Sequence, residues 1–546
     1  MAGMSRSARF VLLVALGLGV FLAGLELMIT ATALPTIVAD IADWTRLRQA
    51  SWIVNGYLVA YVAMMPLAGR LADRFGIVRP FLLALVAFAT GSALSGAAQS
   101  LEPLVAARVL EGIGGGALIP LATAAASHLY EGSARGRALG IIGALTFLGM
   151  AAGPFVGAAI LSVGDMGPAM TAAGLPSTVT SLLAPAWRWV FYVDVPLAFL
   201  VLVYVWAAAA DWDAPRVESP LRLPALVLFT AGLAGALVAL TWAGAPDAPG
   251  GTVGWTVAAA GSIVAIAAAL VVGRRTRDPL LDPRRYTERV LGGAVAVSGL
   301  TGYALATALI GGAVFVDRVL YGGPADQRVA LGGLAASVAV GALVSGLVLS
   351  RTGIVPVTLV GLACSVAGLG LLGGASELTS LDTLAVLLAT FGLGFGLTVS
   401  PRSMAAVEAA GREAFGVASA AVTVARMLGM SVGLAILTAF GSERIESLTR
   451  AVQDQAFRDS ILPAALRGRP LDDGLVVDAL EKWAANQGAG ILAGLFLVAA
   501  AVTAVAVLPA LAMGRQPGRA AEMGAASKAG FGPSSAGVPG TEAPET

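Results

Sequence analysis

The sequence predicts an all-α protein that crosses a membrane many times, and three observations carry this prediction. Of the 546 residues, 57% are hydrophobic and only 12% are charged, against about 25% charged residues in a typical soluble chain. Apolar runs of about 20 residues, long enough to cross a bilayer of about 30 Å, recur along most of the chain. A charged segment at residues 69–79 returns in weaker form at 346–355, which indicates an internal duplication.

The first expected helix covers residues 10–38. It follows a short basic start that contains Arg6 and Arg9. The apolar run is longer than the hydrophobic core of a signal peptide and contains Glu26, so we expect a retained membrane helix rather than a cleaved leader.

The other expected helices are apolar runs separated by charged or by Gly- and Pro-containing turns. In the first half they are residues 51–69, 80–99, 103–127, 138–163 and 188–210. Two further runs, 223–243 and 254–273, precede six more at 290–316, 328–349, 355–375, 381–400, 415–441 and 488–513. The total is fourteen, and sequence patterns place the boundaries only to within a few residues.

The distribution of arginine tests this count, because cytoplasmic loops carry an excess of Arg and Lys. With the N-terminus inside, fourteen spans place most loop arginines on the cytoplasmic side, whereas the short outer loops carry few. The inner set is Arg70, Arg74, Arg79, Arg135, Arg137, Arg216, Arg222, Arg274, Arg275, Arg277, Arg284, Arg285, Arg289, Arg351, Arg402 and Arg412. We therefore expect a multi-pass protein of the cell's inner or plasma membrane with both termini in the cytoplasm.

The spans divide the chain into three membrane parts and several segments outside the membrane. The parts are an N-terminal six-helix bundle at 1–210, two linker helices with a cytoplasmic loop at 211–289, and a C-terminal six-helix bundle at 290–514. Outside the membrane we expect a loop rich in Gly, Pro, Ser and Thr at 164–186, a charged outer extension of helical character at 442–487, and a disordered cytoplasmic tail at 515–546.

The segment that begins at Gly69 reads G-R-L-A-D-R-F-G. Its charges predict a tight turn that meets water between two membrane helices. The pattern resembles the loop between helices 2 and 3 of the major facilitator superfamily, transporters built from two six-helix bundles. The resemblance implies a conformational role for Gly69, Asp73, Arg74 and Gly76, in which Asp73 caps a neighbouring helix or pairs with an arginine across the two halves. The alternative is a solvated turn whose charges only set the topology.

An acidic residue lies inside the first expected helix. Glu26 stands in L-E-L-M-I-T-A-T-A-L-P, residues 25–35, which resembles a motif of the fourteen-helix drug:proton antiporters of this superfamily. A carboxylate in hydrocarbon is costly while it is charged, so Glu26 is expected to bind and release a proton. The alternative is a structural carboxylate that is permanently paired.

Arg108 and Glu111 stand in R-V-L-E-G-I-G-G-G, which is similar to the superfamily motif R-x-x-Q-G-x-G with Glu in place of Gln. At 1.5 Å per residue, Glu26 and Arg108 both fall within about 10 Å of the outer membrane boundary, so Arg108 is a candidate partner of Glu26. Glu111 lies near Arg108 on the same helix surface. A Glu-Arg-Glu cluster would hold a movable proton; alternatively, Arg108 only neutralises Glu111.

The fifth expected helix contains G-M-A-A-G-P-F-V-G, which resembles a motif of antiporters in this superfamily. Gly149, Gly153 and Gly157 allow close packing, and Pro154 bends a helix. We therefore expect a hinge or a seal between the two halves at this segment, which favours export over import.

The sixth expected helix opens with W-R-W-V-F-Y-V-D-V-P, residues 187–196, which resembles a W-R-W-x-F-x-x-N-x-P motif of the fourteen-helix subfamily. The tryptophans are expected to anchor the helix at the membrane interface. Asp194 replaces the Asn of that motif, so it is a second candidate proton site.

Arg426 lies near the middle of the expected helix 415–441, where an arginine needs a carboxylate or a wet cavity. The surrounding sequence resembles the mycobacterial exporters of this subfamily that work with a lipoprotein and are implicated in triacylglycerol export and drug tolerance. Those relatives carry an acid at the position of Phe147. Arg426 therefore needs a different partner here, and Glu26 and Asp194 are the candidates.

Together these resemblances imply proton-coupled export of hydrophobic compounds, either drugs or neutral lipids such as triacylglycerol, by alternating access. The expected proton-coupling residues are Glu26, Arg108, Glu111, Asp194 and Arg426. Cargo is expected to contact a mostly apolar cavity, which suits drugs or lipids better than sugars or anions. A lipoprotein at the outer face is a candidate partner. The alternative is a lipid-binding or signalling membrane protein of the same fold that does not transport.

The sequence offers little support for an enzyme. Cys364 and His128 are the single residues of their types, so no Cys- or His-rich metal site is expected. The sequence contains no nucleotide-binding G-x-x-x-x-G-K loop, and we expect no nucleophile elbow in it. We therefore expect no catalytic residue, metal, cofactor or nucleic-acid partner, and an ion gradient as the energy source.

Overall fold

A computed structural model describes residues 4–41, 52–209, 212–216, 223–243, 251–276, 284, 288–411, 414–470 and 473–514. Throughout these residues the regular structure is helical, and no strand occurs in them. The expected tail at 515–546 lies outside the described residues, as do Arg222, Arg277, Arg285 and Arg412 of the expected inner arginines.

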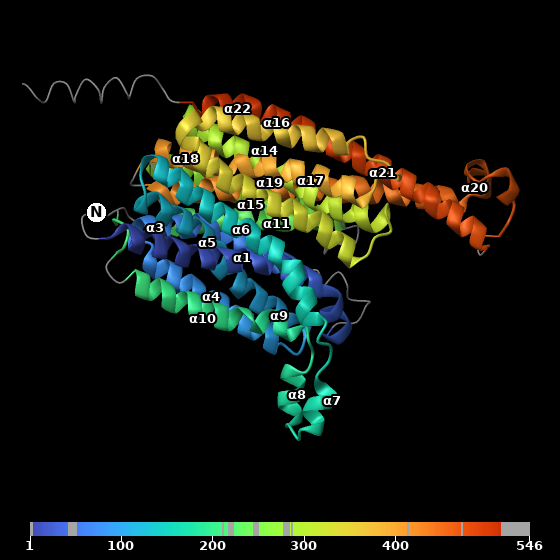
Figure 1. Ribbon diagram of the computed structural model, residues 1–546, viewed down its shortest axis with the longest axis horizontal. Helices are drawn as coiled ribbons and strands as arrows, with labels where there is room; N and C mark the ends of the chain where they lie inside the picture. The colour runs from blue at the N-terminus through green and yellow to red at the C-terminus, as the bar shows by residue number, and fades with distance from the viewer. Residues whose placement is uncertain are drawn as a thin grey trace, which may run out of the picture. The chain divides into compact units, whose positions relative to one another are not determined.

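The N-terminal bundle consists of six membrane helices, the last of them in two pieces (Figure 1). They are α1 (Arg6–Ile41), α3 (Trp52–Phe75), α4 (Val78–Ala97), α5 (Leu101–Leu129), α6 (Gly132–Leu161) and the pair α9 (Arg188–Tyr192) and α10 (Asp194–Ala208). Helix α1 packs along α6, and α5 packs against both α3 and α4. These contacts bury the apolar runs of the first half of the sequence.

The C-terminal bundle is built in the same way. Its helices are α14 (Arg289–Arg318), α15 (Pro324–Thr352), α16 (Ile354–Leu372), α17 (Leu381–Leu397) continued by α18 (Val399–Ala410), α19 (Phe415–Gln453), and α21 (Gly474–Val505) continued by α22 (Val507–Ala512). Helix α14 packs along α19, and α15 packs along α17. The bundles meet where α3 lies against α19 and α6 lies against α15.

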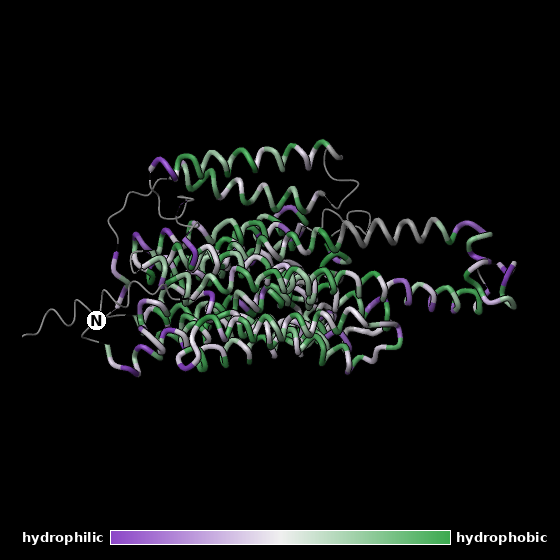
Figure 2. Tube along the Cα trace, turned by 90° about the horizontal axis from the view of Figure 1, so that it is seen from above, coloured by the Kyte–Doolittle hydropathy of each residue, from purple (hydrophilic) through white to green (hydrophobic). Residues whose placement is uncertain are grey.

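Two linker helices separate the bundles in sequence, α11 (Leu223–Ala243) and α12 (Gly251–Thr276). They pack against each other, and α11 also contacts α3 and α19, one helix from each bundle. Thirteen of the described helices are long and apolar enough to cross a membrane, and Pro224–Leu240 is a shorter apolar helix, which agrees with the expected total of fourteen. Figure 2 shows the apolar residues running along these helices.

The charged segment 69–79 differs from the expected turn. Helix α3 continues to Phe75, and only Gly76 and Ile77 connect it to α4. Gly76 has a φ of 83°, a backbone conformation that favours glycine. Arg70 and Asp73 are buried rather than solvated. Residues 69–75 are therefore helical rather than a turn, and the prediction that their charges meet water is wrong for Arg70 and Asp73, because the second bundle packs against this end of α3.

Of three further expectations, the helical character of 442–487 agrees with the structure, whereas the loop 164–186 and the position of Arg402 differ from it. The loop 164–186 contains two short helices that contact each other, α7 (Gly167–Ala172) and α8 (Ser177–Leu183). In the segment 442–487, α19 and α21 run on past the neighbouring helices and are joined through α20 (Gln455–Ile461) and a 3-10 turn at Ala464–Leu466 (Figures 1 and 2). Arg402 was expected in a cytoplasmic loop, and this is wrong. After a turn at Thr398 the chain continues as α18, which buries Arg402.

Candidate functional site

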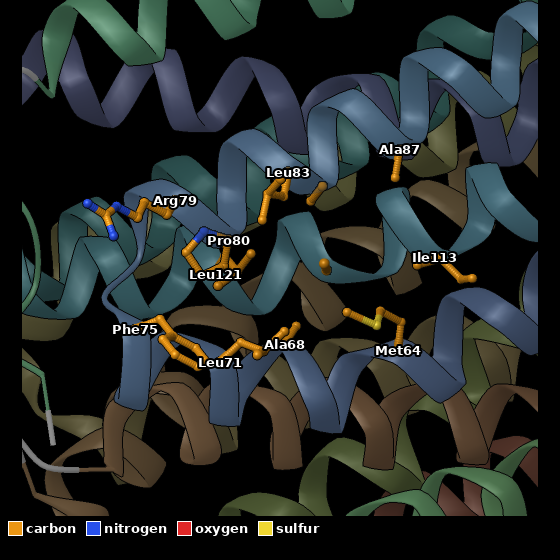
Figure 3. Close-up of a pocket in the computed structure, with 12 residues that line it drawn as sticks. Met64, Ala68, Leu71, Phe75, Arg79, Pro80, Leu83, Ala87, Ile113 and Leu121 are labelled. Carbon is orange, nitrogen blue, oxygen red and sulfur yellow. The ribbon is translucent and has the colours of Figure 1, made fainter. Parts of the chain in front are cut away.

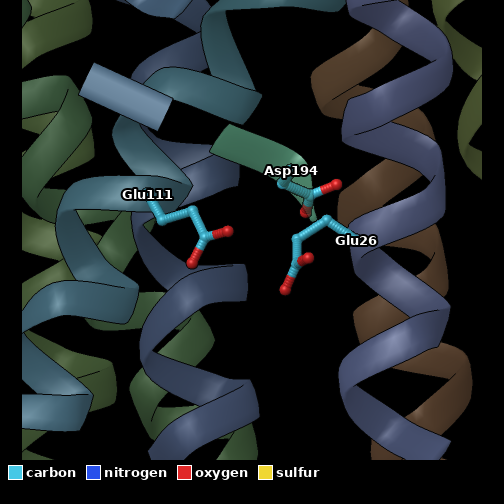
Figure 4. A group of neighbouring side chains, drawn as sticks. All are labelled: Glu26, Glu111 and Asp194. Atoms are coloured by element: carbon cyan, nitrogen blue, oxygen red, sulfur yellow. The ribbon is translucent and has the colours of Figure 1, made fainter. Parts of the chain in front are cut away.

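Four charged side chains meet inside the N-terminal bundle, where α1, α5 and the start of α10 converge. Glu26 comes from α1, Arg108 and Glu111 from α5, and Asp194 is the first residue of α10. All four side chains are at most 1% exposed. One carboxyl oxygen from each of the three acids lies within 4.8 Å of the others, and Figure 4 shows the three groups close together. We call these four residues the acidic cluster.

Arg108 is the centre of the hydrogen bonds in the acidic cluster. Its Nη1 donates to Oε1 of Glu26 and, at 2.7 Å, to Oε2 of Glu111. Its Nε donates to the carbonyl oxygen of Ile53 in α3 at 3.2 Å, and its Cζ lies 4.3 Å from the ring centroid of Tyr57. The guanidinium therefore connects α1, α3 and α5, and its position is fixed from several sides.

The acidic cluster has fewer partners than its oxygens require. Thr30 Oγ1 donates to Glu26 Oε1 at 2.5 Å, and Ser95 Oγ donates to Glu111 Oε2 at 3.3 Å. Both carboxyl oxygens of Asp194 and one oxygen of each glutamate are buried without a hydrogen-bond partner in the described chain. Three carboxyl groups thus lie close together, and the one guanidinium in the acidic cluster bonds to two of them, Glu26 and Glu111. Because an uncompensated buried charge is costly, such a group can bind protons or a cation.

Asp73 connects the two bundles at the end of α3. Its Oδ1 accepts from the backbone N–H of Gly416 at 2.9 Å, and its Oδ2 accepts from that of Val417 at 3.2 Å. These amides belong to the first turn of α19, where a carboxylate satisfies unpaired donors and faces the positive end of the helix dipole. Gly69 allows the close approach, because a Cβ there would lie 2.5 Å from the Gly416 carbonyl oxygen.

A second aspartate makes the same kind of contact within one bundle. Oδ1 of Asp213, which follows α10, accepts from the N–H groups of Ile77 at 2.7 Å and Val78 at 3.1 Å, at the start of α4. The sequence analysis missed Asp213. An Asp five residues after the end of a membrane helix is a weak signal by itself, since its contact to α4 is formed only in the tertiary structure.

We predict that Asp73→Ala loosens the contact between α3 and α19. The substitution removes two hydrogen bonds from the carboxylate to the α19 amides, and losing such a cap costs about 1 kcal/mol, or roughly a fivefold change in the open population. The measurement is the alkylation rate of a cysteine placed at Ala420, in a chain whose native Cys364 is replaced by serine. Asp213→Ala is the matched control, because it removes a similar cap inside one bundle. Equal alkylation rates in both variants would contradict the prediction.

The glycine motif of α6 lies in a different place from the one expected. A Cβ at Gly149 would lie 2.1 Å from the carbonyl oxygen of Phe21, and one at Gly153 would lie 2.9 Å from that of Leu25, both in α1. Gly157 also faces α1. These glycines bring α6 against α1 inside the N-terminal bundle rather than against the second bundle, and the expected hinge or seal at this segment stays a prediction. Pro154 lies within the continuous helix α6.

Arg74 of α3 was expected to have a conformational role. Its guanidinium lies over the ring of Phe75.

A different set of glycines on α6 faces the second bundle. A Cβ at Gly140 would lie 2.7 Å from the carbonyl oxygen of Ala342, and Gly136 lies against Leu349 and Gly346, all in α15. Gly346 is the counterpart of Gly69 in the repeated segment, so the two halves use equivalent glycines for their mutual contacts, α3 on α19 and α15 on α6.

Arg426 does not pair with either carboxylate that was expected. Glu26 bonds to Arg108 instead, and both carboxyl oxygens of Asp194 are buried without a hydrogen-bond partner in the described chain. The guanidinium lies 5.6 Å from the ring centroid of Phe147, and its Nε is buried without a hydrogen-bond partner. The prediction of a Glu26 or Asp194 partner is therefore wrong. Arg426 lines a small cavity of about 30 Å³ between the bundles, together with Arg402.

A larger apolar groove lies within the N-terminal bundle, between α3, α4 and α5 (Figure 3). Its volume is about 500 Å³. The lining includes Met64, Leu71 and Phe75 of α3, Leu83 of α4 and Ile113 of α5, with Arg79 in the first turn of α4. A groove of this composition can hold a hydrocarbon chain, and the sequence analysis did not foresee it because its walls come from three separate helices.

Known proteins place this architecture in a family. Residues 16–434 match the Major Facilitator Superfamily. A triacylglyceride transporter of Mycolicibacterium hassiacum is 34% identical over 458 residues, which cover 80% of each chain. One of Mycolicibacterium smegmatis is 31% identical over 479 residues, which cover 85% of this chain and 81% of the relative.

Solved structures agree with this placement at the level of the fold. A bacterial homologue of the human lysosomal transporter Spinster, inward-facing and occupied, superimposes with a TM-score of 0.56 at 16% identity and covers 94% of this chain and 100% of its own. A proton:xylose symporter gives a TM-score of 0.56 at 14% identity, over 91% of this chain and 95% of its own. The chain thus belongs to the major facilitator superfamily of membrane transporters.

Proposed function

We propose that this transporter is a proton-coupled antiporter that exports hydrophobic cargo by alternating access. The observation that carries the proposal is the acidic cluster, in which three buried carboxyl groups lie close together and the single guanidinium of Arg108 bonds to two of them. Arginine stays charged in proteins. The cluster is therefore neutral only when it holds two protons, and one of these protons is the one we propose to move.

Glu26 and Asp194 are the carboxyl groups that we propose to exchange this proton. Asp194 has two unpartnered oxygens, and Glu26 has one unpartnered oxygen beside its contact with Arg108. Loss of a proton adds a negative charge next to Arg108, which strengthens the hold of the guanidinium on Glu26. Gain of a proton weakens that hold and frees Arg108 to move relative to α1.

Helix α3 offers a direct connection from this event to the contact between the bundles. Its first turn supplies the Ile53 carbonyl oxygen to Arg108, and its last turn supplies Asp73 to the α19 amides. The two positions are about 30 Å apart along the helix. In the proposed cycle, a shift of α3 that follows proton binding weakens the Asp73 contact, and the end of the transporter that holds this contact opens.

The proposed cargo is a lipid or a lipophilic drug. The relatives that share about a third of their residues with this chain are named triacylglyceride transporters. The apolar groove between α3, α4 and α5 supports a cargo with hydrocarbon chains. We also propose the plasma membrane as the location, with both termini in the cytoplasm, and the extension formed by α19, α20 and α21 as the place where an outer-face lipoprotein would bind.

The test is transport by the purified chain in proteoliposomes. Vesicles carry an imposed pH gradient, and the cargo is an ethidium-like cation in one set and a fluorescent triacylglycerol in the other. We expect cargo to move in the direction opposite to the protons, and a protonophore to stop net movement. Protein-free vesicles and a sodium gradient of equal size at uniform pH are the controls.

Three results would count against the proposal. Transport driven by the sodium gradient alone would indicate that the acidic cluster binds a metal cation instead of the coupling proton. A transport rate that does not depend on the pH gradient would contradict proton coupling. If neither cargo moves at any pH, the better account is a lipid-binding or signalling membrane protein of the same fold.

A further inference from the structure

The C-terminal bundle holds two buried arginines whose charges are not balanced by an acid in the described chain. Arg402 of α18 is 1% exposed and Arg426 of α19 is 8% exposed. Nη1 of Arg402 donates to Thr301 Oγ1 at 2.8 Å. Nε of Arg426 is buried without a hydrogen-bond partner. Neither guanidinium forms an ion pair with a described carboxylate, in contrast to Arg108.

Each of the two guanidinium groups lies over an aromatic ring. Cζ of Arg402 lies 4.9 Å from the ring centroid of Phe395, and Cζ of Arg426 lies 5.6 Å from that of Phe147. The two rings contact each other edge to face, with centroids 5.5 Å apart. Ring faces stabilise a cation only partly and leave its N–H donors available. Nε of Arg426 therefore needs an acceptor from outside these contacts.

Both arginines line the cavity of about 30 Å³ between the bundles. The wall opposite them consists of Ile119, Leu139 and Ile142 of the N-terminal bundle. Thr123 and Thr146 also line the cavity, but their hydroxyl groups already donate to the carbonyl oxygens of Ile119 and Ile142 in their own helices. The only cations in the lining thus face a mostly apolar wall.

This arrangement calls for an anion, because arginine cannot shed its charge by losing a proton. An acidic residue in Phe147's position could have supplied the charge, but phenylalanine cannot. A small hydrated anion would lose its water against apolar walls and gain little from them. An oxyanion attached to a hydrocarbon chain fits this cavity better, because the oxyanion can accept hydrogen bonds from the two arginines while the chain contacts the apolar wall.

We propose that Arg402 and Arg426 form a binding site for the carboxylate or phosphate group of an acyl lipid, so that the cargo of this transporter is an acidic lipid. The inference rests on the proposed function, since it names the class of hydrophobic cargo, and it replaces the expectation of a drug or a neutral lipid as cargo. The present cavity has room for little more than a water molecule. The hydrocarbon part therefore enters only when the two bundles move apart.

The test is equilibrium binding of radiolabelled oleate to the purified full chain in nanodiscs. Competitors are oleoyl lysophosphatidate, which carries a phosphate, monoolein, which has the same acyl chain without charge, and inorganic phosphate. We expect lysophosphatidate to displace oleate and monoolein to be at least about 10-fold weaker. The ratio of the oleate and lysophosphatidate affinities tells whether the site prefers a carboxylate or a phosphate.

Substitutions then locate the site. We expect Arg426→Gln and Arg402→Gln each to weaken oleate binding about 10- to 100-fold, because each removes a charge-assisted hydrogen-bond donor. Arg402→Lys keeps the charge and should retain more binding than Arg402→Gln. Arg351→Gln, at an exposed position, is the control and should bind like the wild type.

Several results would overturn the inference. Monoolein could compete as well as oleate, inorganic phosphate could displace oleate as well as lysophosphatidate does, or both arginine variants could bind oleate normally. The competition series needs only the wild-type chain, so it tests the inference even if a variant fails to fold. Binding is measured without a gradient and does not depend on proton coupling. Oleate binding with the expected competition pattern, in a chain whose transport does not depend on the pH gradient, would separate failure of the proposed transport mechanism from failure of this inference.

Discussion

Replacing Glu26 by glutamine is expected to abolish transport driven by a pH gradient, with a loss of about 100-fold or more in the initial rate. Glutamine keeps the shape of the side chain and can still accept a hydrogen bond from Arg108. It cannot gain or lose a proton at this position. The acidic cluster would then contain two carboxyl groups and one guanidinium, and the proposed exchange at the Glu26–Asp194 pair would no longer be available.

The measurement is the rate of cargo movement in proteoliposomes with and without the gradient. Glu26→Asp retains a carboxyl group and should keep part of the coupled rate, whereas Asp382→Asn changes an exposed acid in α17 and should leave it unchanged. Exchange of cargo at uniform pH should persist in Glu26→Gln, which shows that the variant is folded and binds cargo. Coupled transport at the wild-type rate would mean that Glu26 is only a structural carboxylate.

Replacing Arg108 by glutamine is expected to be the most damaging single change to stability, with a cost of about 3–5 kcal/mol. The substitution leaves three buried carboxyl groups without a cation and removes the donor to the Ile53 carbonyl oxygen. The readouts are the melting temperature in detergent and the yield of monodisperse protein.

Arg188 supplies a matched control for this prediction. It is also buried, but its Nη1 donates to the carbonyl oxygens of Gly96 and Ala98, at 2.7 and 2.6 Å, rather than to a carboxylate. Arg188→Gln should therefore cost less, about 1–3 kcal/mol. A cost for Arg108→Gln no larger than that of Arg188→Gln would contradict the charge-balance account.

A double variant separates lost charge compensation from lost packing. In the Arg108→Gln background, Glu26→Gln removes one of the uncompensated carboxyl groups and should restore part of the lost stability. The two substitutions should then be strongly non-additive, by about 1 kcal/mol or more, as expected for residues in one network. Simple additivity would show that Arg108 acts on stability mainly through its contacts with Tyr57 and Ile53.

The membrane architecture could be predicted from the sequence because the bilayer imposes a length and a composition on every span. The expected helix 223–243 matches α11 at both ends, and 290–316 lies within α14. Only the helix ends were misplaced, as at residues 69–75. In a sequence pattern, charged side chains at the end of an apolar run indicate contact with water. In the structure, the second bundle packs against this end of α3, and Arg70 and Asp73 are buried.

The acidic residues could also be found from the sequence, since a carboxylate inside an apolar run is costly and conspicuous. Glu26, Glu111 and Asp194 were all candidates, and the structure brings them together with Arg108. Arg402 could not be found in this way. It follows Pro401 at the end of an apolar run, where a sequence pattern cannot distinguish a loop arginine from one in a helix that continues.

The sequence by itself thus determined the fold class, the count of spans and the identity of the buried acids, because each depends on residues close together in the chain. Tertiary structure alone decided which charges compensate one another. Arg108 meets Glu26 across 82 positions of sequence, and Asp73 meets Gly416 across 343. A buried charge is balanced by whatever lies within a few ångströms of it, and which residues those are follows from helix packing.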